Sequence, residues 1–106
     1  MIIKENIIAD NAVILNIKKI INQIYKLLPG REEGLDWESP LNTIIIELLG
    51  MNDLLPRYQD LLFSLVCKLQ GLHSLKAEEE FISYRRTIFE CLTLCQKIIE
   101  RIAEGE

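Results

Sequence analysis

The feature that most constrains this chain is the recurrence of apolar residues at alternating spacings of three and four. Such spacing places these residues on one face of a helix, and that face has to be buried against other helices. The pattern occurs in four separate segments, which are divided by proline, glycine and capping residues. It therefore predicts an all-α fold, an antiparallel bundle of about four helices that cross at about 20°.

The first predicted helix runs from about Asn11 to Leu28. Asp10 or Asn11 can cap its start, and Pro29-Gly30 is expected to end it. The predicted buried face consists of Val13, Ile14, Ile17, Ile20, Ile21, Ile24, Leu27 and Leu28. The residues before it, Ile2, Ile3, Ile7 and Ile8, are too apolar for a loose tail, so they either extend the helix or fold back as an arm.

The second predicted helix begins at Ser39-Pro40, where Ser39 is the expected N-cap and proline occupies the first helical position. Its expected end is Gly50, which makes it about half as long as the others. The predicted buried face consists of Leu41, Ile44, Ile45, Leu48 and Leu49. The β-branched run at 43–46 also suits a strand, but the proline signal and the continuing apolar pattern favour a helix.

The third predicted helix is capped by Asn52 or Asp53, has Pro56 in its first turn and reaches about Gln70. A turn at Gly71, His73 and Ser74 leads to the fourth helix, from about Leu75 to Ala103. The third helix is expected to bury Leu55, Tyr58, Leu62, Leu65, Leu69 and Leu72. The fourth is expected to bury Phe81, Tyr84, Ile88, Cys91, Cys95, Ile98 and Ile102.

Length and composition narrow the class of protein. A chain of 106 residues with 49% apolar residues is long and apolar enough for one domain, residues 1–106, with its own core. No uncharged run approaches the ~20 residues of a membrane helix, and Lys4 and Glu5 interrupt any secretory signal. Three cysteines are an odd number, which fits a reducing cytoplasm better than a disulfide framework.

The charge distribution predicts the kind of partner. The net charge is −4, and the segment from Glu32 to Asp60 holds seven acids against Arg57 alone. Nucleic acid is a poor candidate partner, because its binding needs a basic surface. The three lysines of the first helix are accompanied by one aromatic residue, Tyr25, so a solvated face is favoured over a membrane surface. A basic protein is the better candidate.

No pattern of residues indicates catalysis, a cofactor or a metal. The one histidine, His73, is interpreted as a turn residue that faces water. Cys91 and Cys95 lie one helical turn apart, so together with Cys67 they supply three zinc ligands where a structural site needs four. We expect the pair to pack in the core instead. The sequence therefore predicts a protein that is not an enzyme.

The connection between the first two helices is acidic and contains the only tryptophan. Trp37 has two interpretations, an apolar plug that folds back over the bundle together with Leu35, or an exposed anchor for a partner. The acids around it, Glu32, Glu33, Asp36 and Glu38, would steer a basic partner. A second acidic cluster, Glu78, Glu79 and Glu80, is expected to be a solvated first helical turn and is the alternative binding face.

The whole-chain profile and the stretches "REEGLDWE" and "KAEEEF" resemble small, acidic, all-helical bacterial immunity proteins, including those of contact-dependent growth inhibition systems. The resemblance implies a cytoplasmic inhibitor that binds a basic toxin, for example a nuclease. The alternative is a helical subunit that forms a homodimer or joins a larger assembly. The apolar residues outside the predicted buried faces support this alternative: Ile46, Phe63, Phe89 and Leu94.

Overall fold

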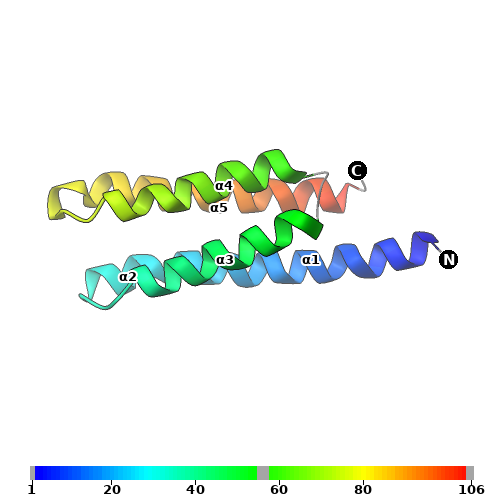
Figure 1. Ribbon diagram of the computed structural model, residues 1–106, viewed down its shortest axis with the longest axis horizontal. Helices are drawn as coiled ribbons and strands as arrows, with labels where there is room; N and C mark the ends of the chain where they lie inside the picture. The colour runs from blue at the N-terminus through cyan, green and yellow to red at the C-terminus, as the bar shows by residue number, and fades with distance from the viewer. Residues whose placement is uncertain (1, 55–57, 105–106) are drawn as a thin grey trace.

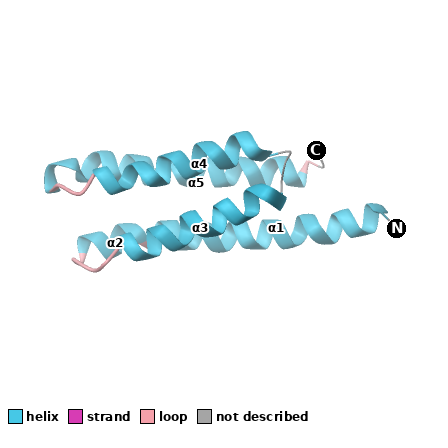
Figure 2. Ribbon diagram, viewed as in Figure 1, coloured by secondary structure: helices cyan, strands magenta, loops and turns pink. Residues whose placement is uncertain are grey.

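A computed structural model describes residues 2–54 and 58–104, with side chains described for 11–51 and 58–104. The described chain is helical almost throughout and contains no strand (Figure 2). The predicted all-α fold is confirmed. The helices are α1 (Ile2–Tyr25), α2 (Leu27–Glu32), α3 (Glu38–Leu54), α4 (Gln59–Gly71) and α5 (Phe81–Ala103), with short 3-10 helices η2 (Leu72–Ser74) and η3 (Glu78–Glu80) between the last two.

The long helices lie along one axis of an elongated molecule that measures 53 × 21 × 20 Å. The chain reverses direction between α1 and α3, between α3 and α4, and again between α4 and α5 (Figure 1). Contacts join α1 to α3, α3 to α4, α4 to α5 and α5 back to α1. Each long helix therefore packs against two others, around a core that runs along the axis.

The core consists almost entirely of the residues that the apolar spacing selects. Among the described side chains, every fully buried residue is apolar, and these include Ile17, Ile24, Leu48, Leu65 and Ile88. The expected faces of the first and fourth helices are buried or half-buried along their whole length. Leu49 is an exception, because it is 50% exposed on α3. Leu55 lies outside the described residues.

The first helical segment, α1 followed by α2, extends further at both ends than the predicted first helix. It begins at Ile2, so the apolar N-terminal residues extend the helix and do not form an arm. Pro29-Gly30 does not end the helical segment, because α2 continues through both residues to Glu32. Proline lacks the N–H that would bond the carbonyl of Tyr25 and crowds it, which explains the interruption at Lys26 between α1 and α2.

The actual helix stop is Gly34. Its φ of +76° is the left-handed conformation that glycine adopts most readily. The N–H of Leu35 donates to the carbonyl of Gly30 at 2.8 Å, and the N–H of Gly34 donates to that of Arg31 at 3.1 Å. These two bonds form the Schellman arrangement that ends a helix.

The helix α3 also differs from its predicted bounds. Its cap is Asp36, not Ser39, because one carboxylate oxygen accepts the N–H groups of Glu38 at 3.0 Å and Ser39 at 3.2 Å. Gly50 does not end it, and the helical backbone continues to Leu54. At 17 residues it is longer than α4, which has 13, so the expectation of a short second helix is wrong.

The last two predicted helices begin later than expected. The positions proposed as the cap of the third helix, 52 and 53, belong to α3, and the helix α4 begins at Gln59. Pro56 lies outside the described residues. The helix α5 begins at Phe81, because Ala77 is extended, with φ −69° and ψ 149°, and the short η3 separates it from the helix.

Candidate functional site

Two connections that are distant in sequence lie at one end of the molecule, on the left in Figure 1. They are residues 30–40, from the end of α2 to the start of α3, and residues 72–80, between α4 and α5; together we call them the loop end. The loop end contains seven carboxylates against two cations, Arg31 and Lys76. Both predicted acidic clusters are therefore at the same end of the fold.

Arg31 holds the two connections together. Its guanidinium donates to the backbone carbonyl of Leu75 and, at 2.8 Å, to that of Ala77. The same group lies 4.3 Å from the ring centre of Tyr84 and 5.5 Å from those of Trp37 and Phe81. A planar cation can donate in two directions while its faces contact aromatic rings, so Arg31 is positioned by both kinds of contact.

Trp37 is half-buried beside this arginine. Its ring meets Tyr84 edge-on at 5.0 Å and stacks with His73 at 6.4 Å. Tyr84 is fully buried, and burial raises its pKa to about 12. These contacts favour the interpretation of Trp37 as a plug, although part of the ring stays accessible. Leu35 takes no part in the plug, because it is 59% exposed.

His73 links the connection at residues 72–80 to α3. Its Nδ1 lies 3.3 Å from Oε2 of Glu38, and its Nε2 lies 2.9 Å from Oδ1 of Asn42. Lys76 reaches the same Glu38 oxygen at 3.1 Å. The side chain is 31% exposed, so the expected histidine facing water is in fact half-buried and bonded. Bonds from Lys76 and then His73 hold the pKa of Glu38 below its ordinary value.

The eight predicted binding residues divide into two groups. Four of them have contacts within the fold: Asp36 caps α3, Trp37 packs on Tyr84, Glu38 bonds Lys76 and His73, and Glu80 accepts the N–H of Ala77 at 3.2 Å. The Ser39 hydroxyl, and then its N–H, lower the pKa of Asp36. The other four, Glu32, Glu33, Glu78 and Glu79, are exposed. None of these four forms an ion pair with another described residue.

A surface hollow of about 510 Å³ joins the two acidic clusters. It is lined by Arg31, Glu32, Trp37, Lys76, Glu78 and Phe81. Glu32 and Glu78 come from different connections, and both line the hollow together with Trp37 and Phe81. We call this hollow the acidic hollow. The sequence suggested two alternative binding faces, and the fold places residues from both around one depression.

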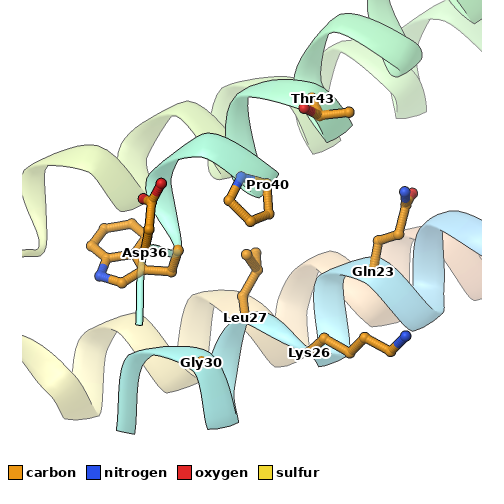
Figure 3. A pocket seen from close by; sticks show the side chains of 8 residues that line it. Gln23, Lys26, Leu27, Gly30, Asp36, Pro40 and Thr43 are labelled. Atoms are coloured by element: carbon orange, nitrogen blue, oxygen red, sulfur yellow. The ribbon is translucent and has the colours of Figure 1, made fainter. Parts of the chain in front are cut away.

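A second hollow of about 340 Å³ lies between α2 and the start of α3 (Figure 3). Leu27 points from α2 toward Pro40, while Asp36 and Lys26 lie at its margin (Figure 3). Gln23 also lines it, and its buried Oε1 has no hydrogen-bond partner among the described residues. This hollow is mainly apolar and shares Trp37 with the loop end.

The three cysteines are in different environments. Cys91 and Cys95 are fully buried, which confirms that they pack in the core, and burial raises the pKa of each thiol to about 12. Cys67 is exposed on α4.

Within the described ranges, no three histidine, cysteine or acidic side chains gather closely enough to hold a metal ion. In the same ranges, no helix is long and apolar enough to cross a membrane.

Arg31, which holds the two connections together, was not identified from the sequence. The available signal was its position, because it is the single base directly before the acidic run. Comparisons with protein families, with curated proteins and with solved structures found no match for this chain. The site is therefore interpreted from its own geometry.

Proposed function

We propose that this chain is a non-enzymatic protein-binding domain that recognises a basic protein through the loop end. The specific form that we propose is an immunity protein, which binds and neutralises a basic toxin, such as a nuclease, in the cytoplasm. The observation that carries the proposal is the acidic hollow, where Glu32 and Glu78 lie beside a half-exposed tryptophan.

The charges of the hollow suit a basic partner. Its two cations are already engaged, Arg31 by backbone carbonyls and Lys76 by Glu38. The loop end also holds seven carboxylates against these two cations, so its net charge is negative, which increases the rate of encounter with a positively charged surface. The accessible part of Trp37 offers an apolar contact at the centre, as is typical of binding hot spots.

Binding also fits the chemistry of this end better than catalysis. The one histidine already contacts Glu38 and Asn42, and the arginine contacts carbonyls and rings. These groups hold the loop end in one shape. A surface of fixed shape with unpaired charges at its rim suits recognition, because little ordering has to accompany association.

The test uses the protein that is encoded directly upstream of this chain. If that protein carries a toxin domain, co-expression with this chain should restore growth, and the purified pair should bind. The variant E32K/E33K should slow association at least tenfold at low salt. The control E100K/E104K makes the same change of charge on α5 and after its end, at the opposite end of the molecule from the loop end, and should leave association unchanged.

Asp36 and Glu38 are left unchanged in this test, because Asp36 caps α3 and Glu38 pairs with Lys76. Helical content and melting temperature should be the same in both variants, since all four substituted residues are exposed. Equal association rates for E32K/E33K and the parent at low salt would contradict recognition through the acidic hollow. A partner that binds without any toxicity would contradict the immunity function alone.

A second candidate function is a structural subunit of a homodimer or a larger assembly. Exposed apolar residues support it, with Ile46 and Phe63 both 69% exposed and Phe89 44% exposed. Leu94, which we also expected to lie outside the buried faces, is half-buried against the core. An apolar interface would depend little on salt, whereas recognition through the acidic hollow would weaken strongly as salt increases.

A further inference from the structure

The outer face of α5 is exposed and apolar at its N-terminal end. Ile82 is 72% exposed and Phe89 is 44% exposed, although the opposite face of the same helix lies in the core. Arg85 and Arg86 lie between them, and these four residues with Phe81 line a hollow of about 330 Å³. The guanidinium of Arg85 lies 5.4 Å from the ring centre of Phe89.

Charges are arranged symmetrically about Ile82. Glu78 and Glu79 come four and three residues before it, and Arg85 and Arg86 come three and four residues after it. Because of this spacing, Arg85 and Arg86 lie on the same face of α5 as Ile82, whereas Glu78 and Glu79 lie in η3, directly before the start of α5. All four charged side chains are exposed, and none forms an ion pair with a described residue. The face is thus negative on one side of Ile82 and positive on the other.

We propose that this face binds a second copy of the chain, with two α5 helices packed antiparallel about a two-fold axis near Ile82. In that arrangement Glu78 and Glu79 of each copy face Arg86 and Arg85 of its partner, and the two Ile82 side chains meet at the centre. A two-fold interface requires a surface that is complementary to itself, and the reversed order of charges about Ile82 supplies it.

Charge complementarity identifies the occupant. An acidic partner would pair with Arg85 and Arg86 but would be repelled by Glu78 and Glu79. A basic partner would pair with the two glutamates but would be repelled by the two arginines. A second copy in antiparallel orientation satisfies all four charges in both chains. The dimer surface shares Glu78 with the acidic hollow, whereas Glu32 and Glu33 take no part in the dimer, so substitutions of those two residues test the proposed function alone.

The first experiment is sedimentation of the full chain from about 10 µM to about 1 mM, a range that covers weak interfaces of small area. We expect a concentration-dependent dimer that dissociates as salt is raised from about 0.05 M to about 0.5 M, because the charge pairs lie at the surface. A chain that stays monomeric throughout this range would overturn the proposal.

The decisive experiment reverses the charges in halves. E78K/E79K makes the face wholly positive and R85E/R86E makes it wholly negative, so each variant alone should be monomeric. Mixed in equal amounts, they should form a heterodimer. The quadruple variant, which carries both changes, should form a homodimer again, because the order of charges is reversed but still complementary to itself.

Two controls accompany the reversals. E32K/E33K should dimerise like the parent, because Glu32 and Glu33 take no part in the dimer. Circular dichroism should show unchanged helical content in every variant, since the substituted side chains are exposed. Dimers that persist in both half-reversed variants would overturn the proposal, as would a mixture that fails to form the heterodimer.

Discussion

The middle of the molecule and its loop end are held together by different physics. In the middle, aliphatic side chains such as Ile17, Leu48, Leu65 and Ile88 fill the space between α1, α3, α4 and α5. At the loop end, Arg31, Trp37, His73 and Glu38 make directional contacts to carbonyls, rings and carboxylates. The middle depends on volume, whereas the loop end depends on particular atoms in particular positions.

This difference determines how each region tolerates change. An apolar core accepts side chains of similar volume, because dispersion and burial have no direction. A contact such as that of Arg31 with two carbonyls requires a donor pair of one geometry, so a substitution that keeps charge can still remove it. We therefore expect the two regions to respond differently to conservative and to truncating substitutions.

Ile88→Ala should have the largest effect on stability. Ile88 is fully buried on α5, and truncation leaves a cavity that the surrounding helices cannot fill. The expected loss is about 2 to 5 kcal/mol in the free energy of unfolding, against about 1 kcal/mol for Ile88→Val. Urea denaturation of both variants measures this. A loss below about 1 kcal/mol for the alanine variant would mean that the middle is loosely packed.

High pH should destabilise the middle through its thiols. Burial raises the pKa of Cys91 and Cys95 to about 12 in the folded chain, so above their ordinary pKa they ionise only on unfolding. The contribution of the two thiols to the free energy of unfolding is intact below about pH 9. Above that pH it decreases by about 1.4 kcal/mol per pH unit for each thiol. At pH 10 the ionisation of both thiols on unfolding should lower the free energy of unfolding by about 3 kcal/mol.

Urea denaturation at pH 8 and pH 10, in the presence of a reductant, measures this loss. Replacing both cysteines with alanine should remove most of the dependence between these two values. The exposed Cys67 is the matched control, since its alanine variant should keep the full dependence. A double variant with the parent's pH dependence would contradict burial of the pair.

Trp37→Ala tests the plug at the loop end. The ring is half-buried against Tyr84 and His73, so we expect a loss of about 2 kcal/mol, below the range for fully buried aromatic residues. Trp37→Phe should recover part of it, because a smaller ring can still meet Tyr84 edge-on. Thermal unfolding measures both. An unchanged melting temperature for the alanine variant would favour the anchor interpretation instead.

Arg31→Lys separates direction from charge. The lysine keeps the positive charge but cannot donate to Leu75 and Ala77 through a rigid fork, so we expect a loss of about 1 kcal/mol. Arg86→Lys is the matched control, because Arg86 is exposed on α5 and should tolerate the change in dilute solution. Equal stability of both variants in urea denaturation would show that the fork is dispensable.

Low pH should have the smallest effect, and it should arise at the loop end. The pKa values of Asp36 and Glu38 are lowered in the folded chain, so each carboxylate stabilises the fold above its ordinary pKa. That contribution is lost as the pH falls below about 4 and the groups become protonated. Melting temperatures from pH 6 to pH 3 measure it. The melting temperature of the Glu38→Gln variant should decrease less over this pH range than that of the parent.

The middle could be predicted from the sequence, because burial follows helical spacing. Ile17, Ile20 and Ile24 were identified in this way, and so were Tyr84, Ile88 and Cys91. The loop end could not, because its hydrogen bonds from Arg31 and His73 join residues 31 to 46 positions apart and depend on how two connections meet. Gly34, not Gly30, ends α2 for a similar reason: both glycines suit a helix end, and local sequence does not decide between them.

The sequence identified the acids and the tryptophan of the loop end, but not Arg31 and not the arrangement of these residues. The acids at 32, 33, 78 and 79 are exposed, as a recognition surface requires. Asp36 and Glu38 were grouped with them by charge alone, whereas the fold uses the first as a helix cap and the second as a partner of Lys76. Composition shows that a segment is acidic, but hydrogen bonds decide which of its acids remain available.

The packing of α5 against α1 has a consequence for how the chain folds as it is synthesised. Contacts between α3 and α4, and between α4 and α5, join neighbouring segments and can form early, whereas α1 meets α5 across most of the chain. Until α5 has left the ribosome, the apolar face of α1 lacks one of its two main partners. During that interval the nascent chain exposes an isoleucine-rich surface, which is where a chaperone would bind or aggregation would begin.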